Sequence, residues 1–532
     1  MQRPMRYFST LFAAMFVACT PSQPPADLVF IGGHVTTTRA TALAVRDGKI
    51  TIIGGDAEVR RLVGDKTRVV NLAGRFIVAS LTDAHGHMLW YGSSLTEVDL
   101  RGCLSAIACA ERMKTRCANA PNGWVFGRGW DDTAFADKVA PTAAVLDAAC
   151  PGRAVWLRRV DEHAGWANTA AMRAAGVTGD GVFVDAASAQ IEAKIPPLTR
   201  EQRKALLLAA QDSLVAMGLT SVHEMGVEPA TEDVFRALAR SGELKLRVVG
   251  YADYGGLKRP LDEAALMARL HDDPDSPDAS LLFTLSGIKL WADGALGSRG
   301  AALMADYSDA PGRRGASFIT RDQLERIVKS AIATDWQLAV HAIGDDANHL
   351  VLDAFEHAGA GGRRFRLEHA QVLMPADLGR FAKLGVIASM QPTHATSDMR
   401  WVAERIGEQR LAGAYAWQTL AKRGAIVVFG SDFPVESPNP WEGLYAATTR
   451  TNAAGEPRGG WRPSERLSPA DALTAFTEHA SFAAHQEHFR GAASAGDVAD
   501  LTVIDQDVLA DKPLRDVRVD MTVVGGRVVY ER

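Results

Sequence analysis

The sequence predicts an α/β fold, a (β/α)8 barrel with a subdomain inserted after its first strand and a small β-sandwich built from both termini. Three observations lead to this prediction. Short apolar, β-rich runs alternate with helical stretches through the middle of the chain, which is typical of parallel strands covered by helices. Both ends of the chain read as β-hairpins. The segment between the first two central strands is far longer than one helix and its loops.

The composition is that of an ordinary globular protein. The chain has 532 residues, of which 47% are apolar and 23% are charged, so it is too long for one simple core and too hydrophobic to be disordered. Its formal net charge is -5, and no block of lysine and arginine stands out. A nucleic-acid partner therefore lacks electrostatic support, and we expect a small-molecule substrate. The composition carries no signal for an oligomeric state.

The amino terminus has the organisation of a secretory signal peptide. Arg3 and Arg6 precede an apolar run from Tyr7 to Ala18, which is too short to span a bilayer as a helix. We therefore predict a signal peptide over residues 1–18. No later segment has the length and apolarity of a membrane span.

The residues that end this run resemble the lipobox of bacterial lipoproteins, because Phe16-Val17-Ala18 stands directly before Cys19. The resemblance implies that Cys19 is lipidated and that residues 19–26 form a flexible tether. We then expect an exported protein on the periplasmic face of a bacterial membrane, in contact with the membrane only through its lipid anchor. Cleavage without lipidation would instead give a soluble periplasmic protein.

The two ends of the folded region share the alternating pattern and glycine turns of hairpins. Gly32-Gly33 and Asp47-Gly48 separate short apolar runs near the start, and Gly525-Gly526 does so near the end. Because the ends have the same character, we expect residues 27–75 and 491–532 to form one sandwich.

Four cysteines lie close together in the expected insert and are expected to form disulfides, since an exported protein meets an oxidising compartment. Residues 105–119 read as a helix, which would hold Cys109 about 12 Å from Cys117 and prevent that pairing. Either Cys103 pairs with Cys109 and Cys117 with Cys150, or one of the crossed pairings with Cys150 forms. The remaining alternative is four buried free thiols.

Residues 76–440 are expected to form the barrel, with the insert at about 90–214 and further barrel helices over 441–490. Helical patterns such as residues 200–217 separate the strands. In such a barrel, polar residues that follow the strands meet at the carboxyl-end mouth, where active sites lie. The eight expected strands are residues 76–81, 220–222, 246–250, 287–291, 337–340, 365–367, 386–390 and 426–429.

Five of these strands end in, or contain, side chains that bind metal ions. His85 and His87 follow the first strand in a His-x-His pattern, which places both imidazoles on one face of an extended chain. Lys289 lies within the apolar fourth strand, where a buried amine needs a partner that binds or pairs with it. The fifth, sixth and eighth strands end at His341, His369 and Asp432. Together these residues exceed what one ion needs and suit two divalent ions.

The motifs around these residues, taken in order, resemble the metal-dependent amidohydrolase superfamily, and within it the branch of N-substituted formamide deformylase-like proteins. The resemblance covers nearly everything from Ala26 to the carboxyl terminus. It is specific for the branch and not for a substrate. The motifs that carry it are Asp83-Ala84-His85-Gly86-His87, Lys289 with residues 292–299, Val340-His341-Ala342-Ile343-Gly344-Asp345, Glu368-His369-Ala370-Gln371 and Gly430-Ser431-Asp432-Phe433-Pro434.

The resemblance implies a metallo-hydrolase barrel and a role for each of these residues. His85 and His87 would bind the more buried ion, and His341 and His369 the more exposed one. Lys289, carboxylated by carbon dioxide, would bridge both; its alternative is a structural ion pair with Asp293. Zinc is the metal expected from the ligand types, although iron or manganese suits the same nitrogen and oxygen ligands.

The resemblance also implies that Asp432 is a metal ligand that takes a proton from the attacking water and passes it to the leaving nitrogen. Four further residues are expected to contact the substrate or to orient the ligands: His163, His223, Asp293 and His394.

The function expected from this set is hydrolysis of a non-peptide carbon–nitrogen bond in an amide, an N-substituted formamide or a cyclic amide, with water activated by one or two divalent ions. The same site would also serve an esterase, a lactonase or a deaminase. A hypothesis from another class is a non-catalytic, membrane-tethered protein that binds a small ligand.

Overall fold

The computed structural model describes residues 24–119, 123–184, 186–255, 260–510 and 514–532. The predicted signal peptide and Cys19 lie outside these residues. None of the described helices has both the length and the apolarity that crossing a membrane requires.

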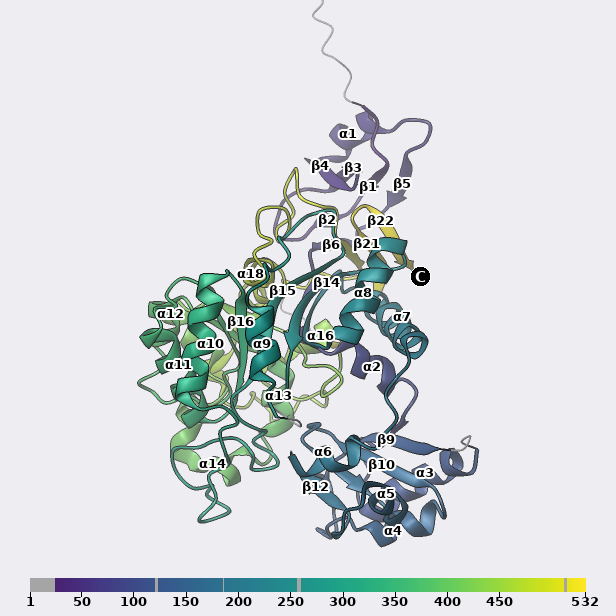
Figure 1. The fold of residues 1–532 in the computed structure, drawn as a ribbon. Helices are drawn as coiled ribbons and strands as arrows, with labels where there is room; N and C mark the ends of the chain where they lie inside the picture. Colours follow the sequence, from purple (N-terminus) through teal and green to yellow (C-terminus); the bar gives the residue numbers. More distant parts are fainter. Residues whose placement is uncertain (1–23, 120–122, 185, 256–259, 511–513) are drawn as a thin grey trace, which may run out of the picture.

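Eight parallel strands form the central sheet, and each strand pairs with the next one in chain order (Figure 1). A parallel bridge between Gly86 and Phe433 connects the first strand to the segment after the last and closes the barrel. The barrel fold is therefore confirmed. Its strands are β7 (Thr82–Gly86), β13 (Ser221–Val227), β14 (Arg247–Asp253), β15 (Phe283–Trp291), β16 (Gln337–Ala342), β17 (Arg366–His369), β18 (Ile387–Met390) and β19 (Val427–Phe429).

The strand expected over residues 76–81 is not part of the barrel, and this prediction was wrong. β6 (Phe76–Ala79) instead pairs antiparallel with β20 (Leu501–Ile504) in a sheet formed by the chain ends. The chain turns at Ser80, which has a left-handed φ of 54°, and then enters the barrel as β7. The polar residues of β7 make it look like a loop in the sequence, whereas β6 has the apolar pattern expected of a barrel strand.

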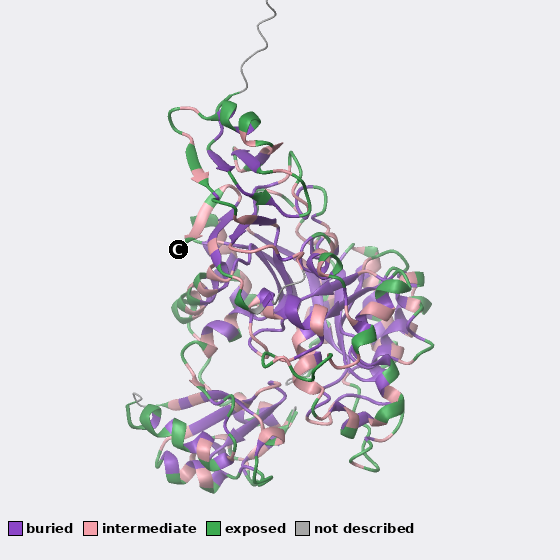
Figure 2. Ribbon diagram, turned by 180° about the vertical axis from the view of Figure 1, so that it is seen from behind, coloured by how far each residue is buried: buried purple, intermediate pink, exposed green. Residues whose placement is uncertain are grey.

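Helices cover the outside of the barrel, and their exposed faces surround a buried centre (Figure 2). α10 shows how such a helix turns its apolar side to the strands, because its Leu324, Ile327 and Val328 are buried. The helices of the barrel domain, on its outside and at its mouth, are α2 (Met88–Ser94), α7 (Arg200–Ala216), α8 (Pro229–Ser241), α9 (Glu263–Arg269), α10 (Arg321–Ala333), α11 (Asp345–His357), α12 (Arg380–Leu384), α13 (Pro392–Asp398), α14 (Val402–Arg410), α15 (Trp417–Lys422), α16 (Pro440–Thr449), α17 (Pro469–Phe476) and α18 (Glu478–Ala483).

The inserted subdomain follows α2 and packs at one end of the barrel, opposite the chain termini (Figure 1). It has its own five-stranded sheet and hydrophobic core. Its elements are β8 (Val98–Asp99), α3 (Ala106–Asn119), β9 (Trp124–Trp130), α4 (Ala143–Ala149), β10 (Ala154–Arg159), β11 (Ala164–Ala167), α5 (Thr169–Ala175), β12 (Val182–Val184) and α6 (Ala186–Glu192).

The cysteines of the insert form one disulfide. Cys117, in the last turn of α3, pairs with Cys150 at the end of α4, with their Cα atoms 5.5 Å apart. The crossed pairings are therefore absent. Cys103 and Cys109 are buried free thiols, so the expected second disulfide is not formed. The two thiols are neighbours, and burial together with Cys103 raises the pKa of Cys109.

The two ends of the chain form two sheets around a shared core, as expected. One sheet is formed by the amino-terminal strands β1 (Leu28–Ile31), β3 (Ala42–Arg46), β4 (Lys49–Gly54) and β5 (Arg68–Asn71). The other joins β2 (His34–Val35) and β6 to the carboxyl-terminal strands β20, β21 (Val519–Val524) and β22 (Arg527–Glu531). The buried ion pair between Arg247 of β14 and Asp500, 2.7 Å apart, fixes this sandwich to the barrel.

Candidate metal centre

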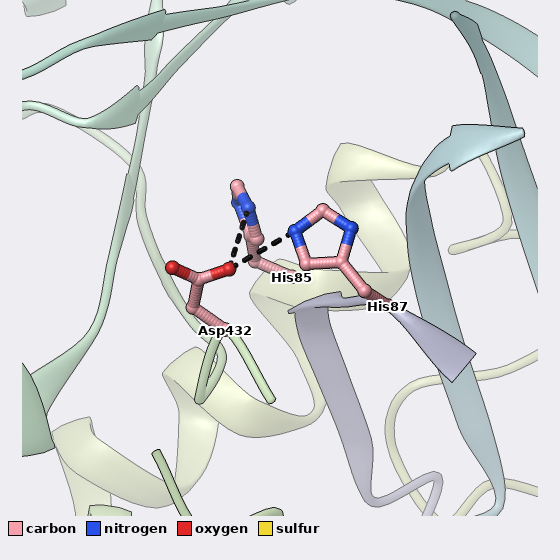
Figure 3. Close-up of side chains that lie close together, drawn as sticks. All are labelled: His85, His87 and Asp432. Carbon is pink, nitrogen blue, oxygen red and sulfur yellow. Dashed lines mark ion pairs between the residues drawn. The ribbon is translucent and has the colours of Figure 1, made fainter. Parts of the chain in front are cut away.

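The centre of the site consists of Asp432, His85 in β7 and His87 directly after β7 (Figure 3). The Oδ1 atom of Asp432 lies 3.1 Å from the Nε2 atom of His87 and 3.4 Å from the Nε2 atom of His85. All three residues are buried. The His-x-His pattern therefore brings both rings to one carboxylate oxygen, as the extended chain predicts.

A second group shares the same aspartate. The ligand atoms of His369, His394 and Asp432 lie within 4.8 Å of one another. His369 ends β17, and His394 lies on α13, which follows β18. Residues from four parts of the barrel, at the ends of β7, β17, β18 and β19, therefore meet at the carboxyl-end mouth.

The backbone around Asp432 is fixed to β7 on both sides. The amide of Asp432 donates to the carbonyl of His85 at 2.7 Å, and the amide of His87 donates to the carbonyl of Phe433 at 2.9 Å. Asp83 accepts hydrogen bonds from both the amide and the hydroxyl of Ser431. These contacts hold Asp432 in a left-handed backbone conformation, with a φ of 59°.

Two buried side chains fix the rings of the histidine ligands. The Nδ1 atom of His85 lies 2.6 Å from the Oε2 atom of Glu368, and the Nδ1 atom of His369 lies 2.8 Å from the Oε1 atom of Gln391. Because both oxygens only accept hydrogen bonds, each Nδ1 carries the proton and each Nε2 keeps its lone pair. This is the tautomer that binds a metal ion through Nε2.

Glu368 is held by Arg366, whose guanidinium donates hydrogen bonds in the barrel interior to five different residues. Its Nε atom lies 2.7 Å from the Oε1 atom of Glu368. His223 belongs to this network, since its Nδ1 atom lies 2.8 Å from Arg366. The partners of Arg366 are Glu368, His223, Tyr251, Ser389 and the carbonyl of Ala84.

Lys289 is fully buried on β15, and its Nζ atom has no hydrogen-bond partner in the part of the chain that the structure describes. Burial lowers the pKa of this amine to about 8. Nζ lies 4.4 Å from the centre of the Trp291 ring. The alternative ion pair with Asp293 is not formed, because Asp293 accepts hydrogen bonds from the amides of Ala302, Ile343 and Gly344.

His341 lies between His369 and His163, with its ring centre 4.6 Å from that of His369 and 5.7 Å from that of His163. The Nε2 atom of His341 lies 3.6 Å from the Oδ1 atom of Asp293. His163 belongs to the insert, and its Nδ1 atom accepts a hydrogen bond from the amide of Ala295 at 3.2 Å. The insert therefore contributes a wall of the site.

The electrostatics of the site suit a cation. Burial lowers the pKa of His85, His341 and His369 well below the usual value, so these rings are neutral at pH 7. Burial would raise the pKa of Asp432, but the histidines beside it outweigh that effect and hold its pKa below the usual range. Neutral imidazoles beside an ionised carboxylate are the ligands that divalent transition metals prefer.

Several buried polar atoms of the site also lack hydrogen-bond partners among the described residues, as expected of atoms that bind a metal ion. They are Nε2 of His85, both ring nitrogens of His341, Nζ of Lys289 and Nε2 of His394. The residues present therefore fit a metal centre.

The cavity above the site has aromatic walls and arginines that are already paired. Trp90 stacks on His87 with ring centres 4.3 Å apart, and Trp291 and Trp401 also line the cavity. Three arginines line it too, and each forms an ion pair: Arg101 with Asp99, Arg159 with Asp161 and Arg400 with Asp131.

A family model described as the amidohydrolase family matches residues 68–530 of the chain. The chain belongs to this family. A putative amidohydrolase, YtcJ, of Bacillus subtilis is 30% identical to it, over 95% of this chain and 99% of that protein. The amidohydrolase is also 31% identical to the protein LONG AFTER FAR-RED 3 of Arabidopsis thaliana, over 98% of this chain and 94% of that protein.

Two further comparisons concern a named deformylase and the solved structure of a hydrolase. An N-substituted formamide deformylase of Arthrobacter pascens is 25% identical to this amidohydrolase, over 95% of this chain and 98% of that protein. A crystal structure of an uncharacterized metal-dependent hydrolase from Pyrococcus horikoshii is 27% identical, with a TM-score of 0.77, covering 92% of this chain and 99% of that one. The amidohydrolase is therefore a metal-dependent hydrolase.

Sequence reasoning missed three residues of this amidohydrolase site: Arg366, Glu368 and Gln391. The first two carried a signal, because opposite charges two residues apart lie on the same face of a strand. Within an otherwise apolar barrel strand, such a pair indicates a buried ion pair. Gln391 carried no signal of its own, because a glutamine after a strand is common on protein surfaces.

Proposed function

We propose that this amidohydrolase cleaves a non-peptide carbon–nitrogen bond in an amide, an N-substituted formamide or a cyclic amide. The observation that supports this most is the position of Asp432. It lies between two groups of histidines at the base of the cavity, where it would reach both an attacking water and a leaving nitrogen. The Arthrobacter relative, named an N-substituted formamide deformylase, supports the same class of bond.

In this proposal, His85, His87, His341, His369 and Lys289 hold one or two divalent ions, zinc by ligand type. Bound cations supply a water of lowered pKa and a polarised carbonyl. Asp432 accepts the proton of the attacking water and donates it to the leaving nitrogen. Lys289 reacts as a neutral amine, forming a bond from its nitrogen to the carbon of carbon dioxide and releasing a proton.

The substrate that fits the cavity is uncharged and moderately apolar. Trp90, Trp291 and Trp401 offer flat apolar surfaces. Each cavity arginine already has a carboxylate partner, so an anionic group would find no unpaired cation among them. His163 lines the same cavity and would contact the substrate.

The test is a substrate panel applied to the full-length protein loaded with zinc, manganese or iron. N-substituted formamides, linear amides and cyclic amides are compared with esters, lactones and aminated heterocycles. We expect turnover of the first group above that of the second, and loss of turnover after dialysis against a chelator. Turnover of esters or lactones alone would assign the site to that reaction, and no turnover in any class would overturn the hydrolytic proposal.

We further propose that the protein is exported and tethered through a lipid on Cys19, as the apolar run from Tyr7 to Ala18 indicates. In the native host, we expect wild type in the membrane fraction and a Cys19→Ala variant in the soluble periplasmic fraction. Membrane association of the variant would contradict the lipid anchor.

A further inference from the structure

The two oxygens of Asp432 face different histidines. Oδ1 lies 3.1 Å from the Nε2 atom of His87 and 3.4 Å from that of His85, whereas Oδ2 lies 3.7 Å from the Nε2 atom of His394. One carboxylate therefore separates two sets of imidazole nitrogens. Because a carboxylate can accept at both oxygens, it can bind a cation on each side.

His394 presents a buried nitrogen to which no described residue of the protein makes a hydrogen bond. Its side chain is 12% exposed, and its Nε2 atom is buried without a hydrogen-bond partner. An unsatisfied buried ring nitrogen costs free energy unless something binds it. Nε2 lies within 4.8 Å of ligand atoms of both His369 and Asp432.

The segment that carries His394 also orients His369. Gln391 accepts a hydrogen bond from the Nδ1 atom of His369 at 2.8 Å, and α13 begins at the next residue. His394 lies three positions after Gln391, and its ring is nearly parallel to that of His369, with an angle of 18° and centres 5.9 Å apart. The end of β18 thus fixes one imidazole and supplies a second beside it.

We propose that His394 is a metal ligand that holds the more exposed ion together with His369 and the Oδ2 atom of Asp432. The other ion is held by His85, His87 and Oδ1. This assignment rests on the proposed metal-dependent function and extends its ligand set by one residue. It also makes Asp432 a bridge between the two ions.

His341 is the ligand that the sequence motifs offer for the same ion, and its ring centre lies 4.6 Å from that of His369. The carboxylate beside it is Asp293, whose oxygens accept three backbone hydrogen bonds. Among the described residues, each candidate group of three metal-ligating side chains contains Asp432, and neither group contains His341. His394 therefore adds to His341 and brings the shared carboxylate of Asp432 into the group around His369.

Bridging leaves Asp432 able to transfer a proton. Each carboxylate oxygen has two lone-pair positions, so binding one ion at each oxygen leaves a second position free. The proposed proton carrier and the proposed bridge are therefore compatible.

The experiment measures metal stoichiometry and affinity by equilibrium dialysis of the full-length protein against zinc, with element analysis. We expect two ions in wild type. In His394→Ala we expect one ion to remain tightly bound and the second to bind at least about 100-fold more weakly, beyond most changes outside the ligand shell. His357→Ala is the matched control, because His357 is an exposed histidine on α11.

Thermal unfolding distinguishes a metal-ligand role of His394 from a purely structural role. Since the Nε2 atom of His394 makes no hydrogen bond in the protein, His394→Ala and His394→Gln should unfold at the wild-type temperature in a chelator. Zinc should then stabilise both variants less than wild type, because the weakened ion no longer favours the folded state. Equal loss of stability with and without zinc would assign His394 to a structural role and overturn the proposal.

The remaining outcomes separate the two proposals. Two ions bound to His394→Ala with wild-type affinity, or fewer than two ions in wild type, would overturn the ligand assignment whether or not wild type hydrolyses amides. If wild type binds two ions, His394→Ala loses one and no substrate is turned over, the assignment holds and the hydrolytic proposal fails.

Discussion

The Nδ1 atom of His85 lies 2.6 Å from the Oε2 atom of Glu368, and neither side chain is exposed to solvent. The contact joins β7 to β17 across the barrel interior. It fixes the proton of His85 on Nδ1 and directs the lone pair of Nε2 toward Asp432. Arg366 balances the charge of Glu368 and holds its other oxygen.

Glu368→Gln is expected to weaken metal binding by about 10- to 100-fold, because the amide no longer fixes the tautomer of His85 as strongly. Metal affinity is measured by equilibrium dialysis, with the unfolding free energy measured in a chelator to account for the unbalanced charge of Arg366. Glu201→Gln, at an exposed position of α7, is the control. Unchanged affinity in Glu368→Gln would remove Glu368 from the ligand-orienting network.

Asp432→Asn is expected to lower turnover by about 10²- to 10⁴-fold, because an amide cannot take up the proton of the attacking water. Turnover is measured on the substrate that the panel identifies, at a fixed metal content for each variant. Asp65→Asn, an exposed change in the terminal sandwich, should leave turnover at the wild-type level. Wild-type turnover in Asp432→Asn would exclude proton transfer by this residue.

Glu224→Gln is expected to change how stability depends on pH. Burial raises the pKa of Glu224 from 4.5 to about 8. Between these values, the folded protein keeps a proton that the unfolded chain releases. The stabilising contribution of Glu224 is therefore complete below about pH 4.5 and is lost as the pH rises through about 8.

The measurement is urea unfolding of both proteins in a chelator, at about pH 5 and about pH 8.5. The Gln variant keeps the acceptor that Met88 uses and cannot ionise, so its stability relative to wild type should increase with pH. Each tenfold difference in proton affinity is worth about 1.4 kcal/mol. A stability difference that does not change with pH would show that Glu224 titrates normally.

The disulfide between Cys117 and Cys150 is expected to stabilise the insert by about 4 kcal/mol, since it closes a loop across 33 positions. Urea unfolding of Cys150→Ala should show this loss of unfolding free energy. Reduction of the disulfide in the folded wild type should leave its turnover unchanged at first. A non-reducing digest should contain one linked peptide pair, with Cys103 and Cys109 alkylated only after unfolding. A peptide linking Cys150 to Cys103 or Cys109 would contradict the pairing.

The barrel could be predicted because its strands alternate with helices in a regular order, and seven of the eight expected strands overlap the observed ones. The exception has a physical cause. β7 is the strand that carries the metal ligands, and polar side chains replace the apolar pattern by which a strand is recognised. The apolar strand just before it belongs to the terminal sandwich, and only its pairing with β20 reveals this.

The sequence by itself determined which residue types end the barrel strands, and these types already specify a metal-dependent hydrolase. The tertiary structure decided which of them meet. His85 and Glu368 are 283 positions apart, and His394 and Asp432 come from different strand ends. Because motif order carries no distances between strand ends, the ring orientations and the division of the Asp432 carboxylate between two histidine groups follow only from the closed barrel.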